Sequence, residues 1–171
     1  SHSMLDHDVA ATNRTYRYGA PAIVPFGFGL SYSSWRLRRA APPAAAAELA
    51  TDGSSADLNV TLTLTNDGPL AGDAIVMAYL APRATVALQP RPVRSLFDFA
   101  RANDVAVGAS ATITFAVNAR SLLLVSKEGD RVAAPGEYAL SFELGDGATS
   151  EAIAVKLVGP QVVVEPFPSV A

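Results

Sequence analysis

The sequence predicts an all-β protein, an antiparallel β-sandwich of about seven or eight short strands. Three observations carry this prediction. Apolar residues alternate strictly with polar ones in several segments, as in strands with one wet face. Gly, Pro, Asn and Asp turn signals recur every ~8–12 residues. Half of the 171 residues are hydrophobic and only 17% are charged, which is enough to bury a single core.

The first half of the chain contains four expected strands. The first starts at Ser31 and ends at Leu37, with Trp35 among Ser and Arg residues. Residues 57–66 (DLNVTLTLTN) alternate most regularly and lead into the turn Asn-Asp-Gly-Pro at 66–69. Residues 74–81 are apolar on both faces, which predicts a central strand, and residues 95–107 predict a bent one.

The second half continues the pattern. Residues 112–117 alternate again, 118–126 contain an apolar run, and 127–130 (KEGD) predict a hairpin turn. Residues 137–144 and 151–158 predict the last two strands. The low-complexity segment 40–47 (AAPPAAAA) leaves two alternatives, a short helix or a loose loop.

Residues 15–32 (TYRYGAPAIVPFGFGLSY) form the least regular stretch, which we call the aromatic arm. Pro21 and Pro25 fix the backbone, and Gly27 and Gly29 permit unusual conformations, so neither a helix nor a plain strand is expected. We expect this arm to lie on a surface and bury its rings. In this chain alone it would either fold back or leave an apolar patch that drives self-association.

Composition excludes several classes of function. The net charge of −3 argues against a nucleic-acid partner. No cysteine is present, which excludes disulfides and Cys-ligated metals, and no apolar window approaches the ~18 residues of a membrane span. His7 between Asp6 and Asp8 offers a metal triplet, but we interpret that segment as a linker and expect no metal and no cofactor.

The domain organisation follows from these patterns. Residues 1–4 (SHSM) are typical of a cloning remnant, and 5–30 are a linker and the aromatic arm. Residues 31–160 form the sandwich, and 161–171 a C-terminal tail.

Several motifs carry a family resemblance. The segments RTYR (14–17) and PFGFGLSY (25–32) resemble the entry to the C-terminal fibronectin type III-like domain of glycoside hydrolase family 3, the β-glucosidases and β-xylosidases. The segments 65–79, 91–99, 107–112 and 135–145 are similar to further motifs of that domain. Asp73 departs from the usual Glu, and the Ala-rich insertion 40–50 has no counterpart.

The resemblance implies a non-catalytic accessory domain. The parent would be a retaining β-xylosidase or β-glucosidase, a carbohydrate-active hydrolase that is extracellular or in the secretory pathway, and its two catalytic carboxylates would lie upstream. No catalytic residue is therefore expected here. The expected partners are the catalytic domains of the same polypeptide and, for some contacts, a β-linked oligo- or polysaccharide, with no nucleic acid and no membrane. The residues expected at the domain interface are Arg14, Tyr16, Arg17, Tyr18, Phe26, Phe28 and Tyr32.

The sequence leaves two alternatives open. The chain could be an autonomous carbohydrate-binding or adhesion module, with Trp35 as the candidate for sugar contact, although Trp35 is more typical of core or interface. It could also be a β-sandwich oligomerisation module. Asn13 and Asn59 each begin an Asn-x-Thr sequon and are candidate N-glycosylation sites.

Overall fold

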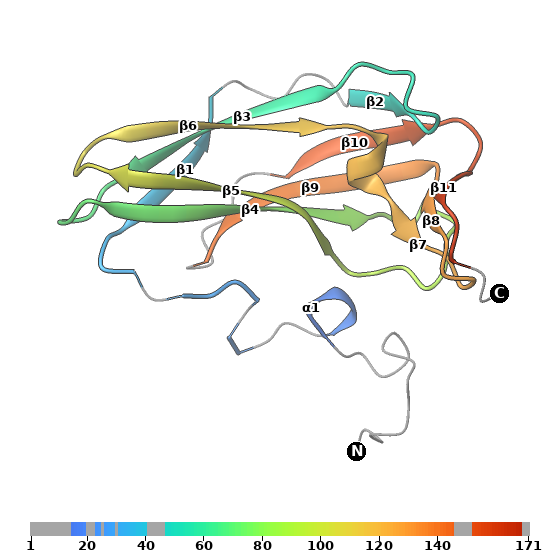
Figure 1. Ribbon diagram of the computed structural model, residues 1–171, viewed down its shortest axis with the longest axis horizontal. Helices are drawn as coiled ribbons and strands as arrows, with labels where there is room; N and C mark the ends of the chain where they lie inside the picture. The colour runs from blue at the N-terminus through green and yellow to red at the C-terminus, as the bar shows by residue number, and fades with distance from the viewer. Residues whose placement is uncertain are drawn as a thin grey trace.

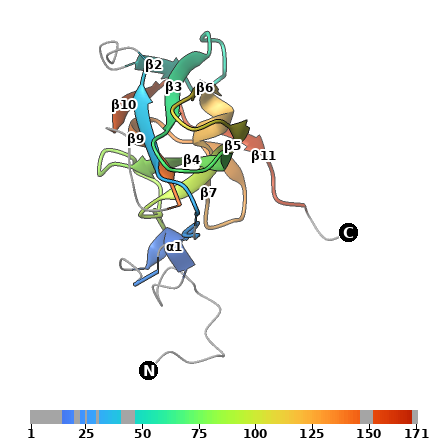
Figure 2. The same ribbon diagram turned by 90° about the vertical axis from the view of Figure 1, so that its left-hand side faces the viewer.

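The computed structural model describes residues 15–19, 23–24, 26–29, 31–40, 47–145 and 152–168. In these residues two β-sheets pack face to face, and the short helix α1 (Thr15–Tyr18) lies beyond them (Figures 1 and 2). The all-β sandwich expected from the sequence is confirmed. No helix among the described residues is long and apolar enough to cross a bilayer.

The three-stranded sheet has the order β1-β3-β6. It consists of β1 (Trp35–Arg39), β3 (Leu58–Asn66) and β6 (Ser110–Val117). The five-stranded sheet has the order β2-β10-β9-β4-β5. It consists of β2 (Ala47–Ala50), β10 (Ile153–Val158), β9 (Gly136–Leu144), β4 (Gly72–Pro82) and β5 (Ser95–Val105).

A small third sheet with the order β11-β8-β7 caps one end of the sandwich. It consists of β11 (Val162–Glu165), β8 (Arg131–Ala133) and β7 (Leu124–Val125), which follows the 3₁₀ turn η1 (Ala119–Leu122). The 127–130 hairpin turn predicted from the sequence joins β7 to β8 and is confirmed.

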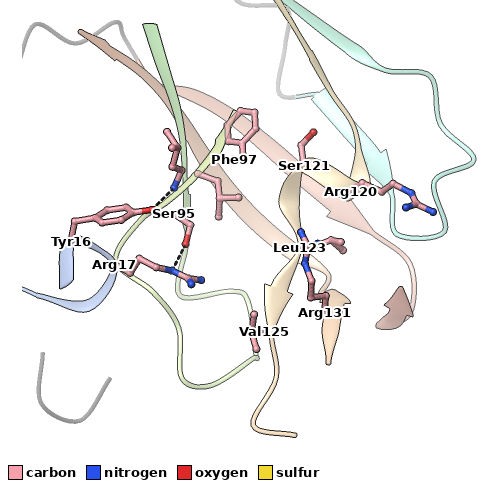
Figure 3. A pocket seen from close by; sticks show the side chains of 11 residues that line it. Tyr16, Arg17, Ser95, Phe97, Arg120, Ser121, Leu123, Val125 and Arg131 are labelled. Atoms are coloured by element: carbon pink, nitrogen blue, oxygen red, sulfur yellow. Dashed lines mark hydrogen bonds between the residues drawn. The ribbon is translucent and has the colours of Figure 1, made fainter. Parts of the chain in front are cut away.

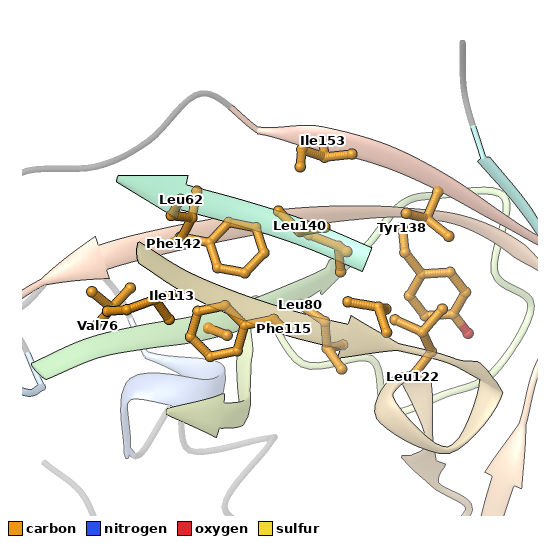
Figure 4. Packing of buried hydrophobic residues seen from close by; sticks show 14 of the residues in the cluster. Leu62, Val76, Leu80, Ile113, Phe115, Leu122, Tyr138, Leu140, Phe142 and Ile153 are labelled. Atoms are coloured by element: carbon orange, nitrogen blue, oxygen red, sulfur yellow. The ribbon is translucent and has the colours of Figure 1, made fainter. Parts of the chain in front are cut away.

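The core lies between the two larger sheets, as the alternation predicts. Leu62 and Phe115 point inward from the three-stranded sheet and meet Phe142 from β9 (Figure 4). The rings of Phe115 and Phe142 are 5.2 Å apart between centroids, in the range where aromatic pairs attract. All three side chains are at most 2% exposed, so truncating any of them would leave a cavity.

Asn66 shows how a polar residue is accommodated at the edge of this core. Its side chain is fully buried, yet every polar atom is bonded. The amide nitrogen donates to the carbonyls of Leu70 and Val105, and the amide oxygen accepts from Gly68 N–H and Ser33 Oγ. Through Asn66, the turn after β3 is therefore bonded both to Ser33, which follows the aromatic arm, and to Val105 at the end of β5.

The structure differs from the sequence-based expectations at a few elements. Residues 15–18 of the aromatic arm form the one-turn helix α1, where no helix was expected, because these four residues precede Gly19 and Pro21 and contain neither residue type. Residues 47–50, placed in or beside the Ala-rich loop, form β2 and pair in parallel with β10, the one parallel pair among the described strands. Residues 162–165, placed in the tail, form β11 and pair with β8. Eleven strands are described rather than seven or eight, because short strands such as β7 are too brief to give a periodic signal. Residues 41–46 lie outside the described part.

Candidate functional site

The aromatic arm folds back against the five-stranded sheet, on the side away from the other sheet (Figures 1 and 2). Tyr16 is its main contact. The hydroxyl of Tyr16 accepts a hydrogen bond from Leu96 N–H at 3.2 Å, and its ring stacks on Phe26 with centroids 4.4 Å apart. Arg17 continues the contact, since its carbonyl accepts from Val93 N–H and its Nε donates to Ser95 Oγ.

The surface under the arm is the outer face of β4. Met77 and Tyr79 alternate with core residues of the same strand, yet they are only 8% and 1% exposed. Gly27 of the arm lies directly against the Met77 side chain, and the Tyr79 hydroxyl lies 3.5 Å from the Phe26 carbonyl oxygen. The arm therefore covers two large side chains that would otherwise face water.

A charged pair borders the covered surface. Arg94 Nη1 lies 2.7 Å from Glu143 Oε2, and the Arg94 guanidinium stands 4.5 Å from the centroid of the Tyr79 ring. Both charged side chains are largely buried, at 25% and 16% exposed. Burial raises the pKa of Tyr79 above the usual phenol value, the nearby Arg94 charge opposing that shift only in part.

The outward side of the arm remains uncovered. Phe26 and Phe28 are each 48% exposed, and Tyr32 is 91% exposed. Ile75 and Phe99 extend this apolar surface onto the sheet, because Ile75 shares a strand face with Met77 and Phe99 pairs directly with Met77 in the β4–β5 register. We call the set Ile23, Val24, Phe26, Phe28, Tyr32, Ile75 and Phe99 the exposed arm surface.

The structure brings together only part of the predicted interface set. Tyr16, Arg17 and Phe26 meet on β4 and β5. In contrast, the side chains of Phe28 and Tyr32 are exposed to solvent. Tyr18 makes a cation–π contact with Arg17. Arg14 and the sequon residue Asn13 lie outside the described residues.

The two other candidate residues lie elsewhere on the sandwich. Trp35 is partly buried against the core, and its indole N–H donates to Ser31 Oγ at 3.1 Å. Asn59 is exposed near the start of β3 and faces the small Ala116 across the β3–β6 pair, so its amide is accessible.

Sequence reasoning missed four residues of this site: Met77, Tyr79, Arg94 and Glu143. A signal was present for the first two. A strand that is apolar on both faces needs cover on both faces, and the core supplies cover for only one. The Arg94–Glu143 pair joins residues 49 positions apart and had no local signal.

Several acidic side chains in the described residues serve local structure. Asp67 pairs with Arg36, and Asp73 pairs with Arg101 while also accepting from Asp104 N–H. Asp130 accepts from Phe167 N–H and so holds the C-terminal segment against the β7–β8 turn. No group of three or more metal-ligating side chains occurs within the described ranges.

A cavity of about 230 Å³ opens where the aromatic arm meets β5, η1 and β7 (Figure 3). Tyr16 and Arg17 of α1 form one wall, with Ser95 and Leu96 of β5. The opposite wall comes from the apolar run after β6 and from β8. The residues on that wall are Arg120, Ser121, Leu123, Val125 and Arg131.

Comparison with known proteins shows which domain family and which enzymes this chain is similar to. A family model described as a fibronectin type III-like domain matches residues 74–143. An exo-1,4-beta-xylosidase of Emericella nidulans is 31% identical over 162 residues, which are 91% of this chain and 21% of that protein. A probable exo-1,4-beta-xylosidase of Aspergillus oryzae is 29% identical over 164 residues. The chain thus spans about a fifth of the length of the curated relatives it matches.

Solved structures agree with this placement. A GH3 exo-beta-xylosidase in complex with a xylobiose aziridine probe superimposes with a TM-score of 0.72 at 22% identity, over 90% of this chain and 21% of that one. A Bifidobacterium adolescentis GH3 beta-glucosidase superimposes with a TM-score of 0.59 at 29% identity, over 78% of this chain and 18% of that one. The chain carries a fibronectin type III-like domain of the kind found in glycoside hydrolase family 3 enzymes.

Proposed function

We propose that this chain is the non-catalytic C-terminal accessory domain of a β-xylosidase- or β-glucosidase-like glycoside hydrolase, and that it braces the catalytic domains of the same polypeptide. The parent would be a retaining enzyme that acts outside the cell, with both catalytic carboxylates upstream. The matched relatives support this proposal, because each is about five times longer than the aligned part.

The observation that carries the proposal is the two-sided arm. Its inner side is held by Tyr16 and Arg17, whose hydrogen bonds reach Leu96, Ser95 and Val93. Its outer side presents half-exposed rings at Phe26 and Phe28. A segment that is fixed on one side and apolar on the other is suited to fill a gap between two domains.

The energetics favour a partner for this surface. Full burial of one large apolar side chain contributes about 1.5–3 kcal/mol, and rings that are already half-covered would gain about half of that. Seven exposed apolar residues belong to the exposed arm surface, and a concentration of exposed apolar residues on a soluble protein is typical of an interaction site. The catalytic domains of the parent polypeptide would be covalently linked to this domain, so they would be the partner that is always present.

The test is a charge placed on the exposed arm surface of the full-length parent. We expect Phe28→Asp to lower the melting temperature of the catalytic part and its activity on aryl xylosides or glucosides. The isolated 171-residue domain with the same change should keep its circular dichroism spectrum. The matched control is Val163→Asp on β11, because Val163 is 50% exposed and Phe28 48%.

Unchanged activity and melting temperature in full-length Phe28→Asp would overturn the bracing role. The carbohydrate-module alternative is tested on the isolated chain, by calorimetric titration with xylo- and cello-oligosaccharides and soluble xylan. Saturable heat that disappears in Trp35→Ala would favour that alternative. The bracing proposal expects no such heat, since Trp35 is packed against the core and bonded to Ser31.

A further inference from the structure

We propose that the cavity between the aromatic arm and the β7–β8 end of the sandwich binds a single-ring sugar acid through its carboxylate. This site is separate from the exposed arm surface and does not rest on the bracing role. It is described by its walls: α1 and the start of β5 on one side, and η1, β7 and β8 on the other (Figure 3).

The charge of the lining points to an anion. Among the described residues of the lining, three are arginines, Arg17, Arg120 and Arg131, and none is acidic. Arg131 is bonded through Nη1 to Glu165, which belongs to β11 and lies outside the lining. Arg17 is held through Nε by Ser95 and forms no ion pair with any described residue. The cavity therefore has an excess of positive charge.

Two of the three arginines lie on opposite walls of the cavity. Figure 3 shows Arg17 on the β5 side and Arg131 on the β7–β8 side, with the Arg120 guanidinium directed away from both. Ser95 is nearly buried and orients the Arg17 guanidinium, and Glu165 orients that of Arg131. Guanidinium groups fixed in this way suit the planar, bidentate recognition of a carboxylate.

The remaining lining argues for a sugar ring behind the carboxylate. Most of the lining is polar, and the Ser95 and Ser121 hydroxyls can bond ring hydroxyls, while Leu123, Val125 and Phe97 add a smaller apolar area for the C–H face of a ring. A volume of about 230 Å³ is below the ~300 Å³ of the smallest drug-sized pockets, which fits one ring and not a longer oligosaccharide. A single acidic side chain of a partner would leave most of this space unfilled.

The experiment is an NMR titration of the ¹⁵N-labelled 171-residue chain with sodium D-glucuronate at constant ionic strength. We expect saturable shifts of the Leu123 and Val125 amides and of the Arg17 and Arg131 Nε–H groups. D-glucose, which lacks the carboxylate, and inorganic phosphate, which lacks the ring, are titrated in parallel. Both are expected to bind more weakly than glucuronate.

Two variants locate the charge contribution. Arg131→Gln and Arg17→Gln should each weaken glucuronate binding about tenfold, the usual effect of losing one hydrogen bond to a charged group. The matched control is Arg36→Gln on the far sheet, because Arg36 is likewise exposed and paired with one carboxylate. It should bind glucuronate like the parent chain.

The proposal fails if glucuronate produces no saturable shift, if glucose binds equally well, or if Arg36→Gln weakens binding as much as Arg131→Gln. Phosphate binding as tight as glucuronate would also overturn it, because the ring would then contribute nothing. If one arginine variant unfolds, the other still decides the outcome.

Discussion

The backbone amide of Leu96, at the start of β5, donates its hydrogen bond to the hydroxyl of Tyr16 at a distance of 3.2 Å. The two residues are 80 positions apart, and this bond joins the aromatic arm to the sheet. Because β5 is an edge strand of its sheet, this backbone amide is bonded by a side chain from the arm rather than by another strand. The arm is therefore part of the folded domain, although its sequence has the composition of a linker.

Replacing Tyr16 should release the arm. We expect Tyr16→Ala to lower the free energy of unfolding by about 2 kcal/mol, from the loss of one hydrogen bond and the stacked contact with Phe26. Urea denaturation gives the size of the effect, and limited proteolysis should show faster cleavage within residues 15–32. Tyr32→Ala is the control, because that ring is 91% exposed. Equal stability of the Tyr16→Ala and parent chains would contradict the role of the arm contact.

Alanine substitutions at two glycines distinguish the cost of backbone strain from the cost of steric overlap. Gly53 and Gly136 both have positive φ, at 77° and 141°. A Cβ at Gly53 would meet open space, whereas one at Gly136 would lie 2.9 Å from the Cα of Val86. We expect Gly53→Ala to cost about 1–2 kcal/mol, from conformation alone. Gly136→Ala should cost at least ~1 kcal/mol more, because Val86 must move. Thermal denaturation of the two variants checks the order, and equal losses would mean that the loop at Val86 yields freely.

Tyr138 should make stability fall in alkali. Its ring is buried and its hydroxyl donates to the Ala134 carbonyl at 2.6 Å, in the manner of a tyrosine corner. Burial raises the pKa of Tyr138 well above its usual value of 10. As pH rises, the unfolded chain therefore releases this proton before the folded chain does. The contribution of Tyr138 to the free energy of unfolding is complete below pH 10 and decreases as pH rises above it.

The variant Tyr138→Phe separates the two effects. Near neutral pH it should be less stable by about 1 kcal/mol, because the hydrogen bond to Ala134 is lost. Above pH 10 its stability should fall less steeply than that of the parent chain, since Phe does not titrate. Urea denaturation at a series of pH values measures both, and parallel alkaline limbs would contradict the assignment.

Asp73 should contribute to stability only when ionised. Its pKa is lowered from the usual 3.8, first by the hydrogen bond from Asp104 N–H and then by Arg101. Because the folded pKa lies below the unfolded one, this contribution is complete above pH ~4 and is lost as pH falls through the lower, folded value. The stability difference between the parent chain and Asp73→Asn should therefore shrink in acid. Asp57→Asn serves as the control, since Asp57 is exposed and bonds no other described residue. A constant difference across the acid range would refute the linkage.

Much of the fold could be read from local sequence. The alternation in residues 57–66 and 112–117 corresponds to β3 and β6, and the double-sided apolar run 74–81 corresponds to β4. Because alternate residues of a strand face opposite sides of the sheet, the period of two residues predicts which side chains face the core. The sequence pattern does not predict β2 (AELA), because its residues do not favour a strand and its parallel pairing with β10 makes it one. In contrast, β11 (VVVE) has the β-branched composition of a strand, but it is too short to show a period and its pairing with β8 is not visible in the sequence.

The site was predictable only in part. The unusual composition of residues 15–32 indicated an arm that buries rings, and Tyr16 and Phe26 do pack together. The sequence does not decide whether the arm folds back or exposes an apolar patch, and the structure shows both, on opposite sides of the arm. No local pattern could tell which rings face inward, because the arm has no regular period.

The sequence by itself determined the sandwich, the positions of its main strands along the chain and the family resemblance, because these depend on periodicity, turn residues and motifs that are local in the chain. Only the tertiary structure decided that Met77 and Tyr79 receive cover from the arm, that Arg94 pairs with Glu143, and that arginines from α1 and β8 line one cavity. Those relationships join residues far apart in sequence. They arise when the sheets stack and the arm folds back. Local sequence patterns do not predict such long-range contacts.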